Sequence, residues 1–90
     1  MNRIEALEAA KHCIDGSRDL DFGEPEDNFS LIAEFWTVYL GCEVTALDVA
    51  MLMALLKVAR IMNGGGSGDS FVDAIGYCAC GAEIAGREEE

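Results

Sequence analysis

Positive charge is scarce in this sequence. Its 90 residues include 17 Asp and Glu but only 6 Lys and Arg, which gives a formal net charge of −11 at pH 7. Phosphate contacts dominate the affinity of nucleic-acid-binding proteins and need a basic surface, and anionic membranes attract the same kind of surface. The composition therefore argues against nucleic acid and against membranes as partners of this chain.

Long uninterrupted hydrophobic runs are also missing. The N-terminal stretch MNRIEALEAAKH carries charges too often to contain the apolar region of a signal peptide. Lys57 and Arg60 interrupt the most apolar segment, well short of the ~20 residues that a membrane-spanning helix needs. We therefore expect a cytoplasmic protein.

Metal-binding and nucleophilic motifs are absent as well. His12 is the only histidine, and no serine or cysteine stands at the spacing of a catalytic triad or nucleophile elbow. Cys78 and Cys80 are two residues apart, which is not the C-x-x-C spacing of zinc or redox sites. We expect no zinc, no disulfide and no organic cofactor. His12 is interpreted as a surface residue, and four cysteines are interpreted as small buried groups: Cys13, Cys42, Cys78 and Cys80.

Hydrophobic residues, in contrast, are abundant. They make up 51% of a chain that is long enough for one domain, residues 1–90. A domain of this size buries only about 60–65% of the surface that its unfolded chain exposes. A homo-oligomer, a homodimer or larger, would bury the surplus between subunits. A monomer with an apolar surface is the alternative.

The apolar periodicity predicts an all-α fold, a four-helix array or bundle with helices at about 3–14, 28–40, 46–62 and 70–85. Asn2 can cap the first helix, Asp27 or Asn28 the second, and Thr45 with Asp48 forms a variant of the capping box before the third. Gly41 can end the second helix.

Three segments lie outside these helices. Residues 15–27 form an acidic loop, either a flexible connector or a cover over a site. Residues 63–68, NGGGSG, are expected to be a linker, because the lysine and the strand of a P-loop are missing. Residues 86–90 are expected to be a frayed, acidic tail.

The segment 49–60, VAMLMALLKVAR, is the feature around which we expect the chain to be organised. A helix that is apolar on nearly all sides belongs in the centre of an assembly. The helix at 28–40 carries two apolar stripes, so we expect it to be covered on two sides. The last helix contains several small residues, which we interpret as positions of close helix packing. Its apolar residues also predict a seam with 4-3-4-3 spacing, at Phe71, Ile75, Cys78, Ala82 and Ala85.

Opposite charges should meet where the last two helices are joined. A short turn makes them antiparallel, which brings Lys57 and Arg60 near Asp69 and Asp73. One interpretation is a structural ion-pair network. The other is a polar pocket, in which carboxylates bind Mg²⁺, the cations bind phosphate oxygens and Tyr77 lines the wall.

Several separated motifs follow one another along the chain. They are Arg18, Asp21-Phe22-Gly23-Glu24-Pro25, Asn28-Phe29, Trp36, Leu56-Lys57-x-x-Arg60 and Asp69-(x)₃-Asp73-x-x-Gly76-Tyr77. This pattern, over about residues 17–84, resembles a family of small phage- and prophage-encoded helical proteins of unassigned function. The resemblance implies a phage protein in the cytoplasm of the host and does not imply an activity.

A looser similarity is to the all-α nucleoside triphosphate pyrophosphohydrolases of the MazG type. Those enzymes are helical oligomers that bind Mg²⁺ through acids on two helices and cleave nucleotides to monophosphate and pyrophosphate. By this resemblance Asp69 and Asp73, together with Glu34, would bind Mg²⁺. The ligand- and phosphate-binding residues would be Lys57, Arg60, Tyr77, Arg18 and Phe22.

Two functions therefore stay open. One is Mg²⁺-dependent binding or pyrophosphohydrolysis of an NTP or dNTP. The other is a non-catalytic homo-oligomeric helical interaction module. The second stays open because Glu34 stands alone on its helix, without the paired E-x-x-E motif of the MazG-type enzymes.

Overall fold

The computed structural model describes residues 1–15, 25–65 and 68–89, and every regular element within these ranges is a helix. The predicted all-α class is therefore confirmed. The elements are α1 (Arg3–Ile14), α3 (Pro25–Leu40), α4 (Ala46–Arg60), the short π-helical segment η1 (Ile61–Gly65) and α5 (Gly68–Glu89).

Two helices are longer than predicted. The second begins at Pro25, not at residue 28, and proline suits a first turn because its missing N–H would have no partner there. Asp27 and Asn28 are thus inside α3, and their predicted capping role is wrong. α5 extends to Glu89, so most of the predicted tail is helical. Of the predicted acidic loop, residues 16–24 lie outside the described residues.

Three other helix ends lie at the residues that the sequence predicted. The Asn2 Oδ1 atom accepts a hydrogen bond from the Glu5 N–H at 2.8 Å, and the Glu5 carboxylate accepts one from the Asn2 N–H. Thr45 and Asp48 form the same reciprocal capping box at the start of α4. Gly41 follows α3 with a φ of +72°, a conformation that favours glycine. Local sequence therefore fixes these boundaries.

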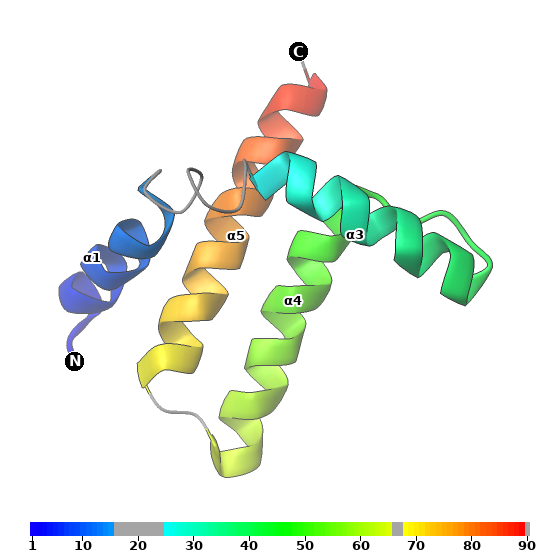
Figure 1. Cartoon of the computed structure of the whole chain (residues 1–90). Helices are drawn as coiled ribbons and strands as arrows, with labels where there is room; N and C mark the ends of the chain where they lie inside the picture. Colours follow the sequence, from blue (N-terminus) through cyan, green and yellow to red (C-terminus); the bar gives the residue numbers. More distant parts are fainter. Residues whose placement is uncertain (16–24, 66–67, 90) are drawn as a thin grey trace.

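Helix α5 lies in the middle of the molecule (Figure 1). It forms an antiparallel hairpin with α4, and α1 packs against α5 on its other side. Helix α3 crosses the N-terminal part of α4 and also contacts α5. In the single chain α5, and not the 49–60 segment, contacts all three other helices. The place of the 49–60 segment at the centre of an assembly stays a prediction.

The main core forms where α3, α4 and α5 meet. Its buried members are Phe29, Ala33, Val49, Ala50, Cys80 and Ile84. Most of these side chains are small, so the three helices can approach closely. Trp36 and Tyr77 are partly buried at the edge of this core.

Two glycines of α5 face neighbouring helices, and at one of them, Gly81, the absence of a Cβ atom allows a close approach. A Cβ atom on Gly81 would lie 2.6 Å from the Met51 Cε atom and 3.5 Å from the Ala50 Cβ atom of α4. A Cβ atom on Gly76 would lie 3.7 Å from the Ile14 Cγ2 atom of α1. The interpretation of the small residues as positions of close helix packing is confirmed for Gly81.

The predicted 4-3-4-3 seam of α5 is wrong. Phe71, Cys78 and Ala82 are exposed, whereas Val72, Cys80 and Ile84 are buried. The reason is that α1 and α4 cover α5 from different sides, so its buried residues do not follow a single stripe. The prediction that the cysteines are small buried groups is confirmed for Cys80. It is wrong for three exposed thiols: Cys13, Cys42 and Cys78.

Large apolar side chains remain exposed on α3 and α4. On α3 they are Leu31, Phe35, Val38, Tyr39 and Leu40, and on α4 they include Leu52, Leu55 and Leu56. Within the described part of the chain, α3 is thus covered along one stripe and not along two. In the described ranges, no helix combines the length and the apolar character needed to cross a membrane.

Candidate functional site

The α4–α5 hairpin brings together one predicted pair of opposite charges. The Lys57 Nζ atom lies 3.0 Å from the Asp73 Oδ2 atom, which confirms the predicted proximity of these two residues. The lysine side chain is 19% exposed and the aspartate side chain 42%. The pair is therefore partly shielded from water, and the two charges neutralise each other.

Three other predicted residues lie around this pair. Arg60, one turn after Lys57 on α4, and Asp69, one turn before Asp73 on α5, are both exposed. Tyr77 follows one turn after Asp73, and its ring centroid is 6.2 Å from that of Phe29 on α3. Tyr77 thus packs at the edge of the core, one turn from Asp73, while Arg60 and Asp69 face solvent near the closed end of the hairpin.

Glu34 lies elsewhere. It is exposed on α3 and lines an open pocket of about 360 Å³ beside the N-terminal end of α4, together with Ser30, Ala33, Thr37, Val44, Thr45 and Ala46. Ala46 and Lys57 are eleven residues apart on one helix. That separation corresponds to about 16 Å along the axis. A single chain therefore does not bring Glu34 together with Asp69 and Asp73.

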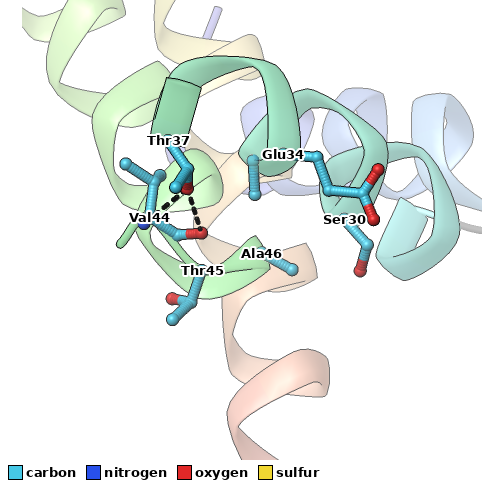
Figure 2. Close-up of a pocket in the computed structure, with 7 residues that line it drawn as sticks. Ser30, Glu34, Thr37, Val44, Thr45 and Ala46 are labelled. Atoms are coloured by element: carbon cyan, nitrogen blue, oxygen red, sulfur yellow. Dashed lines mark hydrogen bonds between the residues drawn. The ribbon is translucent and has the colours of Figure 1, made fainter. Parts of the chain in front are cut away.

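Hydrogen bonds of Thr37 fix the shape of this pocket. The Thr37 Oγ1 atom accepts from the Val44 N–H at 2.9 Å and donates to the Val44 carbonyl oxygen at 3.4 Å. Figure 2 shows Thr37 and Val44 facing each other across the α3–α4 turn, with Glu34 and Ser30 toward the other side of the pocket. Sequence reasoning missed this pocket, because its residues come from two helices without a shared motif.

The remaining predicted site residues are Arg18 and Phe22, which lie outside the described residues. Among the residues that the structure describes, no group of three or more His, Cys, Asp or Glu side chains is arranged to hold a metal ion. Mg²⁺ binding by Asp69 and Asp73 stays a prediction, and Glu34 could join them only from another copy of the chain.

The Lys57–Asp73 pair should make a small, salt-sensitive contribution to stability. A double-mutant cycle with Lys57→Met and Asp73→Asn is expected to give a coupling energy of up to about 1 kcal/mol, because solvent reaches the carboxylate. Urea unfolding followed by circular dichroism measures this energy. It should shrink in 1 M NaCl, where the Debye length is about 3 Å. A coupling energy of zero would contradict a stabilising pair.

The family model for a domain of unknown function, DUF6378, matches residues 5–85 of the chain. The chain belongs to the DUF6378 family. It is also similar to the Gene 55 protein of Mycobacterium phage D29, with 43% identity over 74 residues, and to the Gene 55 protein of Mycobacterium phage L5, with 39% identity over 88 residues. These findings support the expectation of a phage protein of unknown function.

The DUF6378 chain spans about half the length of these relatives. The D29 alignment covers 82% of this chain and 49% of the relative, and the L5 alignment covers 97% and 56%. No solved structure matches the chain significantly.

Proposed function

We propose that this DUF6378 chain is a non-catalytic helical module that associates with itself. The observation that carries the proposal is the number of large apolar side chains left exposed on α3 and α4. Phe35 and Leu55, for example, are 68% and 61% exposed. Large apolar patches on a small protein mark binding surfaces, because their removal from water is favourable.

The charged end of the hairpin supports a structural role. Lys57 is bound to Asp73, so this charge has a partner within the chain, and the pair links α4 to α5. Such a contact fixes the relative position of two helices without a ligand. In this proposal the charges stabilise the hairpin, and the apolar surface carries out the function.

Light scattering after size-exclusion chromatography tests the proposal. The chain is expected to elute as a homo-oligomer at micromolar concentration, with a mass that is a multiple of 9.7 kDa. A single 9.7 kDa species at every concentration, up to the highest that stays in solution, would overturn the proposal.

The second candidate function is Mg²⁺-dependent binding of a nucleoside triphosphate, with or without pyrophosphohydrolysis. It is favoured by the access of solvent to Asp69, Arg60 and the Asp73 carboxylate at one end of the hairpin. Asp69 and Asp73 are four residues apart and share a helix face, as two oxygen ligands of Mg²⁺ would. Lys57 and Arg60 would bind phosphate oxygens.

A thermal-shift experiment with a panel of NTPs and dNTPs, with and without Mg²⁺, tests the second candidate. A ligand that binds the folded state raises the melting temperature. Asp69→Asn is the informative variant, because Asp73→Asn also breaks the ion pair with Lys57. The candidate predicts a Mg²⁺-dependent shift in the wild type that Asp69→Asn reduces. No shift with any nucleotide at millimolar concentration would exclude it.

A further inference from the structure

The pocket beside the start of α4 owes its space to one face of α3. Ser30, Ala33, Glu34 and Thr37 follow one another at intervals of three, one and three residues, so they lie on the same side of the helix. A helix face that looks onto a neighbouring helix usually carries large apolar side chains. Here the side chains are small or polar, and they leave an open pocket of about 360 Å³. Its volume lies near the lower end of the range of small-molecule sites, about 300–1,000 Å³.

Hydrogen bonds hold the far wall of this pocket in place. The Thr37 Oγ1 atom bonds both the N–H and the carbonyl oxygen of Val44, and the Thr37 carbonyl oxygen accepts from the Gly41 N–H at 2.9 Å. The turn between α3 and α4 is thus tied to α3 at two points (Figure 2). A pocket that is already formed loses little conformational entropy when a ligand enters.

Two polar side chains of the pocket have no partner in the protein. In the described part of the chain, no hydrogen bond or ion pair joins the Glu34 carboxylate or the Ser30 hydroxyl to another residue. The other walls are the methyl groups of Ala33, Val44 and Ala46. The pocket therefore offers one negative charge and one hydroxyl group beside an apolar surface.

The charge of the pocket selects a cation. The Glu34 carboxylate repels anions, and the chain as a whole has a net charge of −11. The N-terminus of α4 would attract an anion through its helix dipole. The Asp48 carboxylate already offsets this dipole, however, because it accepts a hydrogen bond from the Thr45 N–H at 3.0 Å.

We infer that this pocket binds an alkylammonium group, as found in a lysine side chain or in a free primary amine of similar length. The three N–H donors of the ammonium head serve the Glu34 carboxylate and the Ser30 hydroxyl oxygen. The hydrocarbon stem packs on Ala33, Val44 and Ala46, which a bare metal ion would not use. This inference is independent of the proposed self-association, which rests on the exposed apolar side chains.

An NMR titration of the ¹⁵N-labelled chain with n-pentylammonium chloride tests the inference. The amide signals of residues 30–37 and 44–46 should shift together, with a dissociation constant of about 1–10 mM for a ligand of so few atoms. Neutral n-pentanol has the same stem without the charge, and it should bind about 3–5-fold more weakly. The anion n-pentanoate should bind more weakly than n-pentanol.

Glu34→Gln and Glu43→Gln form a matched pair of variants. Each removes one negative charge, but Glu43 lies in the α3–α4 turn and is not among the residues that line the pocket. Glu34→Gln should weaken pentylammonium binding about 3–5-fold, and Glu43→Gln should leave it unchanged within about twofold. Equal weakening by both variants would show that the acidic chain attracts the cation without a site, and would overturn the inference.

Ser30→Leu tests the pocket by its volume. Ser30 is exposed on α3, so the variant should keep its helical content, which circular dichroism verifies. The leucine side chain should fill the space and abolish the shifts with both pentylammonium and pentanol. The inference is overturned if these shifts persist, if the wild type shows none at about 100 mM pentylammonium, or if pentanoate binds most tightly.

A capped lysine distinguishes the two sources of the amine. N-acetyl-lysine methylamide carries the backbone of a peptide on the same stem. Shifts with this compound that match those with pentylammonium would assign the pocket to a lysine side chain of a partner protein. Shifts with pentylammonium alone would support the inference for a free amine and exclude the lysine of a protein.

Discussion

Replacement of Ile84 by alanine is expected to lower the free energy of unfolding by about 2–5 kcal/mol. Ile84 is 1% exposed and belongs to the core between Phe29 and Ala33 of α3 and Val49 and Ala50 of α4. The substitution removes buried methyl groups and leaves a cavity that is lined by three helices. These helices cannot all move to fill it. The free energy of unfolding of a native protein is typically about 5–15 kcal/mol, so this loss is a large part of the total stability.

Ile4→Ala is the matched control for this prediction. Ile4 is 61% exposed on α1, so the same change should alter stability by less than about 0.5 kcal/mol. Urea and thermal unfolding, followed by circular dichroism at one fixed protein concentration, measure both variants, because self-association would make stability depend on concentration. Equal effects at the two positions would show that Ile84 is not at the junction of the helices.

Gly81→Leu should destabilise the α4–α5 hairpin by about 1–3 kcal/mol or more. The Cβ atom alone would come within 2.6 Å of the Met51 Cε atom, with the Leu47 Cδ1 atom at 3.6 Å. The end of the flexible Met51 side chain can move for one methyl group, so Gly81→Ala should be nearly neutral. A leucine side chain has no such room and would push the two helices apart.

Gly86→Leu tests the same substitution where space is open. No heavy atom outside the immediate surroundings of Gly86 lies within 4 Å of its Cβ position. Leucine should therefore stabilise α5 there by up to about 1 kcal/mol, the difference in helix propensity. Opposite signs for the two leucine variants in urea unfolding would support the close approach of α4 and α5. A stabilising Gly81→Leu would refute it.

Local and short-range features of the fold were predictable. The reciprocal caps of Asn2 and Thr45 need only residues within one helical turn. The proximity of Lys57 to Asp73 could be predicted with one further premise, that two helices joined by a short turn are antiparallel. The structure begins α3 at Pro25, earlier than the predicted residue 28, because proline is well tolerated in a first turn, where its missing N–H would have no partner.

The separation of Glu34 from Asp69 and Asp73 was not predictable. Each acid could be placed on its own helix, but their distance depends on where α3 crosses α4. The same holds for the pocket that Thr37 and Val44 shape, since its two walls come from different helices. The residues predicted to form one site therefore lie in two separate regions of the molecule.

By itself, the sequence determined the helical class, three of the helix ends and the proximity of Lys57 to Asp73. Only the tertiary structure decided that α5 contacts all the other helices and that Leu52 and Leu55 of α4 face outward. The physical reason is that periodicity orients side chains about the axis of their own helix and does not specify the neighbouring helix. Residues 49–56 are apolar on every side of α4, so either face could have packed on the core. Gly81 of α5 packs on Ala50, and Leu55 is left on the surface.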